Sequence, residues 1–315
     1  MPVLVFFTRR AVAAVVLLVA ITALAFTLVY SSNNNIARNI LGELATQEQI
    51  DALSAELGLD RPLVVQYLDW LVSAVQGDLG VSFVTGTPVV DSLAIRLPVT
   101  LSLVTVSLVV AALIAIVLGI VAAVRRGWVD RGVQIFSVAA ESLPNFWVGL
   151  ALVSTFAIGL AWFPATGYVP IDQSVTGWVS TITLPVIALA LSCIASTAQQ
   201  IRSAVIDVLK KDYVRTLRAR GLPEGAILAR NVLRNAAPPA VTVVSLQFIG
   251  MLSGAVLIER VFALPGLGSL AVNAAIQSDI PVVMGVLVVA AVIVVVVNLA
   301  VDLAVTWINP KARIQ

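Results

Sequence analysis

Residues 97–124, LPVTLSLVTVSLVVAALIAIVLGIVAAV, form one long apolar segment that contains no charged side chain. A helix needs about 20 predominantly apolar residues to cross the hydrocarbon core of a bilayer. The whole chain has the same character, because 60% of its 315 residues are hydrophobic and only 11% are charged. Soluble domains average roughly 45–50% apolar residues. The sequence therefore predicts an all-α integral membrane protein.

Working outward from this segment, we predict six transmembrane helices. The first follows Arg9 and Arg10, and its apolar run is longer than the core of a signal peptide, so we expect an uncleaved anchor. The fourth is the shortest and contains Pro185. The six predicted spans are Ala11–Tyr30, Leu97–Val124, Val133–Leu160, Thr183–Thr197, Ala240–Ile258 and Pro281–Trp307.

The distribution of Lys and Arg predicts the orientation of these spans. Of the 19 basic residues, 15 lie in the two terminal tails and in the loops after the second and fourth spans. Cytoplasmic loops carry an excess of Lys and Arg, so both termini are predicted to be cytoplasmic. The chain then divides into residues 1–30 (tail and first span), an extracytoplasmic segment 31–96, a transmembrane domain 97–308 and a cytoplasmic tail 309–315.

The extracytoplasmic segment is predicted to be helical. Thr46 and Gln49 have the spacing of a capping box, and Gly58 follows an apolar face as a stop signal. A second helix is predicted to begin at Pro62 and to end before Gly77. A solvated spacer is the alternative interpretation of this segment.

Several classes of chemistry lack the residues that they need. The chain has no histidine and one cysteine, Cys193, which excludes a cysteine metal cluster and removes the commonest general base. It has no phosphate-binding loop, and its Gly266-Leu267-Gly268 sequence follows Pro265 in a predicted outer loop. The basic residues are bracketed by membrane-length segments, which does not favour nucleic acid as a partner. If ATP drives this protein, another polypeptide must bind the nucleotide.

Polar residues within the spans allow two interpretations. Glu141 and Asp302 could couple transport to an ion gradient, but charges near helix ends are more often solvated or paired. Other polar side chains either bind neighbouring helices or line a path for a polar solute. The candidates for a pore lining are Ser142, Asn145, Gln199, Gln247 and Asn298. Pro144 and Pro185 are expected to disturb helical hydrogen bonding within their spans.

The loop after the fourth span, DYVRTLRARGLPEGAILARNVLRNAAPP (residues 212–239), contains five arginines. An apolar stripe with a four-residue repeat is predicted to continue from the fourth span through the first part of the loop, and a second narrow face follows the turn. Gly221 ends the first helix and Pro223 begins the next. Such a basic amphipathic hairpin suits either anionic lipid or the groove of a protein partner. The two predicted faces are Val205, Leu209, Tyr213 and Leu217, and then Leu222, Ala226, Ala229 and Leu233.

The loop resembles the EAA-type cytoplasmic loop of ABC importer permeases, in the version found in dipeptide, oligopeptide and nickel permeases. Arg215, Thr216 and Leu217 occupy the positions of the EAA triplet, and Gly221 is the glycine after it. Arg234 stands where the general motif has a proline. The resemblance extends along nearly the whole chain through LGLDRPLVVQYLDWLVSAVQGDLGVSF, RLPVTLSL, ESLPNFWVGL, WFPATGY and ERVFALPGLGSL.

This resemblance implies a type I ABC importer transmembrane fold in a bacterial cytoplasmic membrane. In such permeases two related subunits form the pore, two ATP-binding subunits hold ATP and Mg, and an outer solute-binding protein delivers the solute. The chain itself is then expected to have no catalytic site, cofactor or metal. The implied loop, about residues 203–239, would couple to the ATPase through Arg215, Thr216, Leu217, Arg218, Gly221, Leu222, Pro223 and Leu233.

The resemblance leaves the solute open, since the family carries peptides, nickel and other compounds. The absence of histidine favours peptides over a metal ion. An ion-coupled secondary transporter that uses Glu141 or Asp302, and a membrane scaffold without a transport role, are the alternatives from other functional classes.

Overall fold

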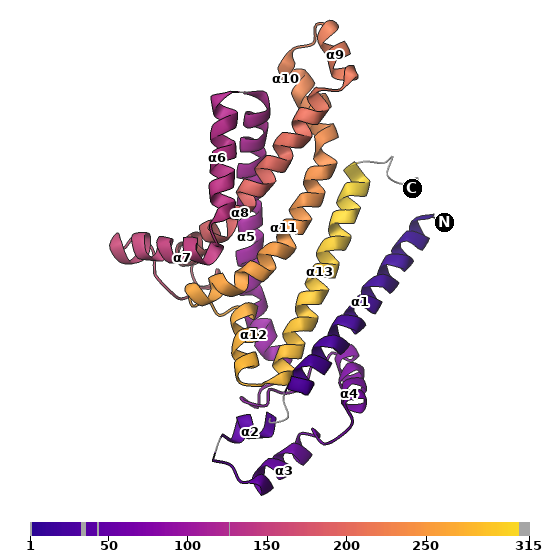
Figure 1. Ribbon diagram of the computed structural model, residues 1–315, viewed down its shortest axis with the longest axis vertical. Coiled ribbons are helices and arrows are strands. Elements are labelled where there is room, and N and C mark those ends of the chain that lie inside the picture. The colour runs from indigo at the N-terminus through magenta and orange to yellow at the C-terminus, as the bar shows by residue number, and fades with distance from the viewer. Residues whose placement is uncertain (1, 33–35, 43, 126, 309–315) are drawn as a thin grey trace. The chain divides into compact units, whose positions relative to one another are not determined.

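The computed structural model describes residues 2–32, 36–42, 44–125 and 127–308. Over these residues the chain is almost wholly helical (Figure 1), and its only extended pairing is an isolated bridge between Val81 and Pro88. The prediction of an all-α protein is confirmed. The chain divides into two compact units, Met1–Pro98 with Ser269–Val296 and Val99–Gly268 with Val297–Gln315.

The first unit contains the N-terminal helix and the segment that follows it. A cluster of apolar residues forms its core, in which Phe26 and Ile36 pack with Ile280 and Met284. Buried Asp279 accepts hydrogen bonds from the hydroxyl of Ser82 and from the backbone N–H of Phe83. The helices are α1 (Pro2–Ser32), α2 (Ile36–Leu41), α3 (Gln47–Glu56), α4 (Leu63–Val75), most of α12 (Leu267–Ile276) and the first part of α13 (Ile280–Ile308).

The helix signals of residues 31–96 are confirmed. The N–H of Gln49 donates to the Thr46 hydroxyl at 3.4 Å, and the N–H of Thr46 donates to the Gln49 side chain at 2.9 Å, which completes the capping box. Gly58 follows α3 with a φ of +66°. Pro62 precedes α4, and Gly77 follows it with a φ of +89°. The described part of this segment is therefore largely helical, with α2, α3 and α4, rather than a solvated spacer.

The second unit is built around α8, which packs against α6, α7 and α11. Small residues along α8 allow neighbouring helices to approach closely. At Gly119 of α5, for example, an added Cβ would lie 2.8 Å from the carbonyl oxygen of Ala198. The elements of this unit are the main part of α5 (Val89–Val124), α6 (Trp128–Ser142), α7 (Asn145–Leu152), the π-helix η1 (Val153–Gly159), α8 (Val175–Leu209), α9 (Asp212–Ala219), α10 (Glu224–Ile227), the π-helix η2 (Leu228–Val232) and α11 (Leu233–Val261).

Helices occupy all six predicted membrane spans. Among the described residues, α5, α8 and Ile280–Val301 of α13 are each long and apolar enough to cross a membrane. A bent pair, α6 with α7 and η1, could form a fourth span. The helices α1 and α11 lie at the predicted first and fifth spans, and their crossing of the membrane remains a prediction.

Two predicted spans need correction at their prolines. The third, Val133–Leu160, is not one helix, because the chain bends by 94° between α6 and α7. Pro144 lacks an N–H, and Leu143 before it adopts an extended backbone, so the helix ends there. The fourth span is longer than predicted, since α8 passes through Pro185 and begins at Val175. The N-cap residue is Ser174, whose hydroxyl accepts from the N–H of Gly177 at 3.0 Å.

Candidate functional site

The basic loop forms a helical hairpin at one end of the second unit, consisting of α9, a turn, α10 and η2 (Figure 1). The predicted helix, sharp turn and second helix are therefore present. The predicted continuity with the fourth span is wrong, because α8 ends at Leu209 and Lys211 takes an extended backbone before α9 begins.

Gly221 makes the sharp turn of the hairpin. Its φ is +76°, its N–H donates to the carbonyl of Arg218 at 2.9 Å, and the N–H of Leu222 donates to the carbonyl of Leu217 at 3.3 Å. These two bonds form a Schellman motif, in which glycine is favoured because it has no Cβ to clash in the left-handed conformation. Pro223 then caps the start of α10 with a φ of −68°. The predicted roles of Gly221 and Pro223 in the turn are confirmed.

An ion pair closes the turn from outside. The Arg218 guanidinium donates to both carboxylate oxygens of Glu224, at 2.6 and 3.1 Å. Because this contact favours both charged forms, it raises the pKa of Arg218 and lowers the pKa of Glu224. The pair joins the last turn of α9 to the first turn of α10.

This ion pair predicts that the hairpin loses stability at acidic pH. The pKa of Glu224 is lower in the folded loop than its ordinary value of 4.5, so the ion pair stabilises the loop fully above pH 4.5. This stabilisation is lost as the pH falls through the lower pKa of the folded state. In ¹³C NMR of the glutamate-labelled protein, the Glu224 carboxyl is expected to titrate below 4.5. The substitution Arg218→Gln should move its midpoint upward, and an unchanged midpoint would contradict the contact.

The inner face of the hairpin is apolar and differs in part from the predicted faces. Val214, Ile227 and Val232 are fully buried in a cluster with Val205 of α8, while Leu217 and Leu233 pack partly against it. In contrast, Tyr213 and Leu222 are more than one-third exposed and Ala229 is exposed. The predicted periodicity failed because the helix is interrupted after Leu209 and because η2 has the wider spacing of a π-helix.

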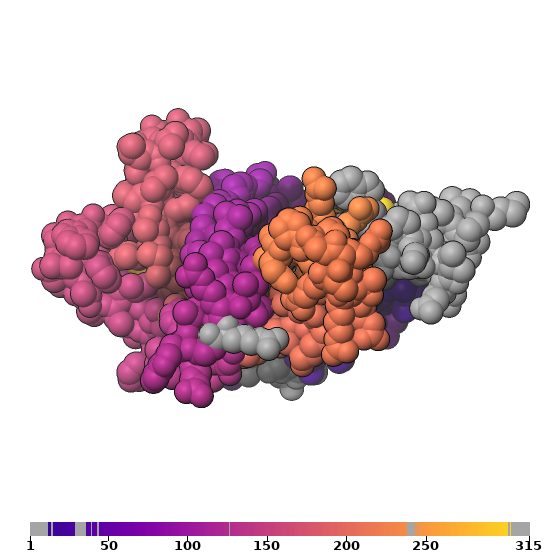
Figure 2. Space-filling model, turned by 90° about the horizontal axis from the view of Figure 1, so that it is seen from above, coloured from indigo at the N-terminus to yellow at the C-terminus, as the bar shows by residue number. Residues whose placement is uncertain are grey.

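The outer face of the hairpin carries most of the predicted coupling residues. Arg215, Thr216, Arg218, Gly221, Leu222 and Pro223 are exposed, and Leu217 and Leu233 lie partly buried beneath them. Figure 2 shows the hairpin, in orange, beside the purple surface of α5 and α6. Arg125, directly after α5, is also basic and exposed.

A second ion pair ties α6 to α8. The Arg202 guanidinium donates to both carboxylate oxygens of Asp130, one of them at 2.7 Å, and the two side chains are 21% and 16% exposed. Sequence reasoning missed this pair, since residues 72 positions apart give no periodic signal.

Breaking the second ion pair should destabilise the second unit. Removal of one partner from a buried pair costs about 3–5 kcal/mol. Because the two side chains here are still partly exposed to solvent, we expect a smaller loss of roughly 2 kcal/mol for Asp130→Ala. We expect a lower melting temperature in detergent. The exchanged pair Asp130→Arg with Arg202→Asp should recover part of the loss, and equal melting of wild type and Asp130→Ala would contradict a stabilising role.

Two of the polar residues predicted to line a pore have contacts between α11 and another helix. Gln247 of α11 donates to the Ser196 hydroxyl of α8 at 2.7 Å. Asn145 lies near Gly254 of α11, where an added Cβ would be 3.5 Å from its side-chain nitrogen. Ser142 donates to the carbonyl of Val138 in its own helix, Gln199 is half-buried and Asn298 is exposed. Glu141 is exposed, and the side chain of Asp302 lies outside the described part of the structure.

A buried carboxyl group near the end of α11 was also missed. Glu259 is completely buried and accepts from the Thr100 hydroxyl at 2.5 Å, while that hydroxyl accepts from the N–H of Leu267 at 2.8 Å. Gly266 and Gly268 pass so close to Glu259 that neither position has room for a Cβ. The two closely spaced glycines were considered above only as a phosphate-loop motif. They were the one feature of the sequence that could have indicated a close approach of the backbone to a buried side chain.

Two family models match the chain. One, described as the binding-protein-dependent transport system inner membrane component, matches residues 115–314. The other describes the N-terminal part of such membrane components and matches residues 3–104.

Known relatives match over nearly their full length. A Brucella abortus protein named as a peptide transport system permease is 37% identical over 97% of this chain and 98% of its own. The oligopeptide transport system permease protein AppB of Bacillus subtilis is 36% identical over 96% and 97%. The glutathione transport system permease protein GsiC of Escherichia coli is 36% identical over 97% of both chains.

A solved structure supports the fold. A chain of the MetNI methionine ABC transporter in inward-facing conformations matches with a TM-score of 0.56 at 17% identity, over 69% of this chain and 96% of the other. Together with the two family models, this match shows that the protein is an all-helical permease subunit of an ABC importer and belongs to the family of binding-protein-dependent transport system inner membrane components.

Proposed function

We propose that this chain forms half of the translocation pore of an ATP-driven importer of peptides. The observation that carries the proposal is the full-length similarity to permeases named for peptide and oligopeptide transport. Glutathione, for which the Escherichia coli relative is named, is itself a tripeptide. A nickel or other small-solute importer of the same family is the alternative, and the lack of histidine argues against a metal ion as the solute.

The proposed topology has six membrane spans with both termini in the cytoplasm. The spans are α1, α5, the bent α6 and α7 pair, α8, α11 and α13, and residues 31–96 lie on the outer side. The basic residues support this orientation. Residues 97–308 would then form the transmembrane domain, while the proposed cytoplasmic tail, 309–315, lies outside the described residues.

The proposed mechanism is alternating access driven by separate subunits. The permease is not an enzyme, and its family requires an ATPase and a solute-binding protein as partners. We place the outer face of the hairpin, with Arg215, Thr216 and Arg218, in a groove of an ATP-binding subunit. ATP and Mg would be held there and not by this chain. Because the inner face packs against α8, movement of the hairpin would be transmitted to the membrane helices.

A second, related permease is proposed to complete the pore. Polar side chains of α7, α8, α11 and α13 would then line the solute path, with Asn145, Gln199, Gln247 and Asn298 as candidates and Ser142 at the end of α6. The contact between Gln247 and Ser196 supports a polar connection between α8 and α11. Peptides need such hydrogen-bonding groups because their backbone amides are costly to desolvate.

Uptake by the reconstituted complex tests the proposal. Proteoliposomes with both permeases, both ATPase subunits and the binding protein should accumulate labelled di- and oligopeptides only with ATP. Replacement of the nucleotide-binding lysine in the ATPase subunits should abolish uptake. Uptake by this chain alone that a protonophore abolishes would instead support the ion-coupled alternative, and uptake of nickel without peptides would overturn the solute class.

A further inference from the structure

We infer that α4 lies in the outer leaflet of the membrane, with one face against α1 and the opposite face in contact with lipid acyl chains. The inference rests on the proposed topology, in which α1 crosses the membrane and residues 31–96 follow it on the outer side. It changes the role of α4 from a helix in the aqueous outer segment to part of the membrane-embedded protein.

The inner face of α4 is fixed to α1 by an aromatic cluster. The ring of Phe26 in α1 lies 5.5 Å from the ring of Tyr67 and 6.3 Å from that of Trp70, measured between centroids. The Tyr67 hydroxyl donates to the carbonyl of Val19 at 3.1 Å and lies 3.0 Å from the Thr22 hydroxyl. Figure 1 shows α4 beside the C-terminal half of α1.

These contacts place part of α4 at the depth of the hydrocarbon. Thr22 and Val19 precede Tyr30, the last residue of the predicted first span, by 8 and 11 residues. With a rise of 1.5 Å per residue, they lie roughly 12–16 Å below the outer end of the span. A helix that meets α1 at this depth cannot stand wholly in the aqueous phase.

The outer face of α4 is an aliphatic stripe with helical spacing. Val64, Leu68, Val72 and Val75 recur at intervals of four, four and three residues, and their exposed fractions are 69%, 51%, 58% and 82%. No charged residue interrupts the stripe, although Asp69 lies at its edge. A helix that is apolar on both faces is typical of surroundings without water. The helix to which α4 is bound has the same character, since Val16 and Leu24 of α1 are also exposed.

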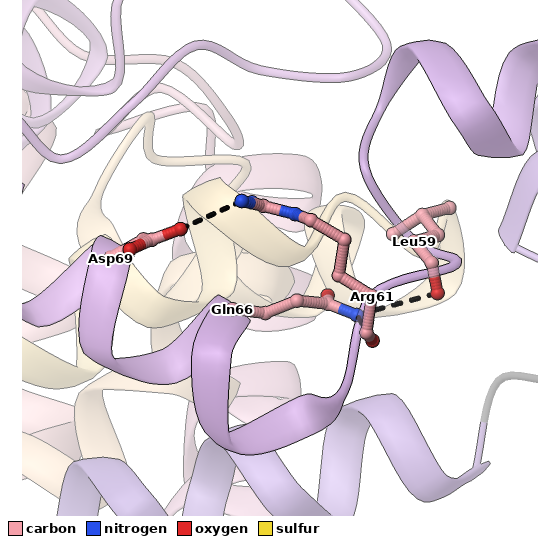
Figure 3. Close-up of polar contacts among 4 residues, drawn as sticks. All are labelled: Leu59, Arg61, Gln66 and Asp69. Atoms are coloured by element: carbon pink, nitrogen blue, oxygen red, sulfur yellow. Dashed lines mark hydrogen bonds and ion pairs between the residues drawn. The ribbon is translucent and has the colours of Figure 1, made fainter.

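The polar side chains of Gln66 and Asp69 in α4 have local partners, as a membrane environment favours, whereas the buried indole nitrogen of Trp70 has no hydrogen-bond partner in the described structure. Figure 3 shows Gln66 reaching back to the segment before α4, where its side-chain nitrogen donates to the carbonyls of Arg61 at 2.6 Å and Leu59 at 3.3 Å. In the same view, Asp69 accepts from the Arg61 guanidinium at 2.8 Å. Both partners of this pair are at least half exposed, so they can lie at the level of the lipid headgroups while the stripe lies deeper.

The composition of the stripe favours lipid over a protein partner. Protein interfaces are enriched in Tyr, Trp, Met and Arg, whereas the stripe contains only Val and Leu. The two aromatic residues of α4, Tyr67 and Trp70, are committed to the contact with Phe26. Acyl chains need only an apolar surface, which the stripe provides.

Spin-label accessibility tests this inference in the complete transporter. In a Cys193→Ser background, nitroxides would be attached after Leu68→Cys or Val72→Cys, and the complex would be placed in vesicles of palmitoyl-oleoyl phosphatidylcholine and phosphatidylglycerol. Val16→Cys in α1 provides a lipid-exposed reference, and Glu48→Cys in α3 provides an aqueous one. We expect collisions with oxygen to exceed those with a water-soluble nickel chelate severalfold at positions 68, 72 and 16, and the reverse at position 48.

Each other result overturns the inference in a distinct way. Nickel-chelate accessibility at positions 68 and 72 equal to that at position 48 would place α4 in water. Low accessibility to both reagents would mean that a protein subunit covers the stripe. If the label at position 16 also behaves as aqueous, the proposed topology fails together with the inference. None of these measurements depends on peptide uptake, so the proposed function is tested separately.

Discussion

Replacing Gly221 by valine is expected to reduce ATP-driven uptake about tenfold or more while leaving the protein inserted in the membrane. An L-residue in the left-handed conformation costs roughly 1–2 kcal/mol, and a β-branched side chain adds crowding. A penalty of 1.4 kcal/mol corresponds to a factor of ten. Because the φ of Gly221 is +76°, valine would shift the hairpin away from the shape that we propose the ATPase recognises. When both are measured on the same proteoliposomes, uptake should fall while ATP hydrolysis continues.

A matched substitution distinguishes backbone strain from bulk at the same position. A Cβ at Gly221 would meet no atom within 4 Å, so the size of the new side chain is not obstructed within this chain. Asparagine is larger than alanine but tolerates the left-handed conformation better. We therefore expect Gly221→Asn to retain more uptake than Gly221→Ala. The opposite order would show that the partner, and not the turn, excludes side chains at this site.

The substitution Gly266→Ala is expected to cause a large loss of stability. Its Cβ would overlap the carboxyl group of buried Glu259, which cannot move without losing the hydroxyl of Thr100. Overpacking of a tight site costs about 1–3 kcal/mol, and loss of a partner by a buried charged or polar group adds a comparable amount. We expect a strongly lowered melting temperature in detergent and little folded protein by size-exclusion chromatography.

The control for this prediction is Gly250→Ala in α11. A Cβ at position 250 would meet nothing within 4 Å, and alanine is a better helix former than glycine by about 1 kcal/mol. This variant should melt at or above the wild-type temperature. If Gly266→Ala and Gly250→Ala behave alike, the close approach of residue 266 to Glu259 is not what stabilises this region.

The sequence predicted the features that depend on local signals. The capping box at Thr46, the turn at Gly221 and the starts at Pro62 and Pro223 are each decided by a few adjacent residues, and the structure confirms all of them. Apolar length alone indicated where the long helices lie. Family resemblance, rather than periodicity, favoured a protein partner over lipid for the hairpin, and this choice stays a prediction.

The features that were missed depend on residues far apart in the chain. The contacts of Arg202 with Asp130 and of Glu259 with Thr100 join different helices, and no repeat in the sequence indicates them. Proline was also ambiguous, because Pro144 ends a helix while Pro185 is accommodated inside one. Neighbouring helices decide such cases, and a single sequence does not identify those neighbours.

The hairpin is closed by contacts between residues that are near neighbours in sequence. The Schellman bonds join residues 217 and 222 and residues 218 and 221, and the outer ion pair joins residues 218 and 224. Such short-range contacts require little loop closure and form rapidly. During synthesis the turn can therefore take shape as soon as this loop emerges from the ribosome, before α11 and α13 have been made. If the hairpin binds the ATPase as we propose, the assembling transporter would present a preformed surface, and assembly of the subunits need not wait for the pore to be complete.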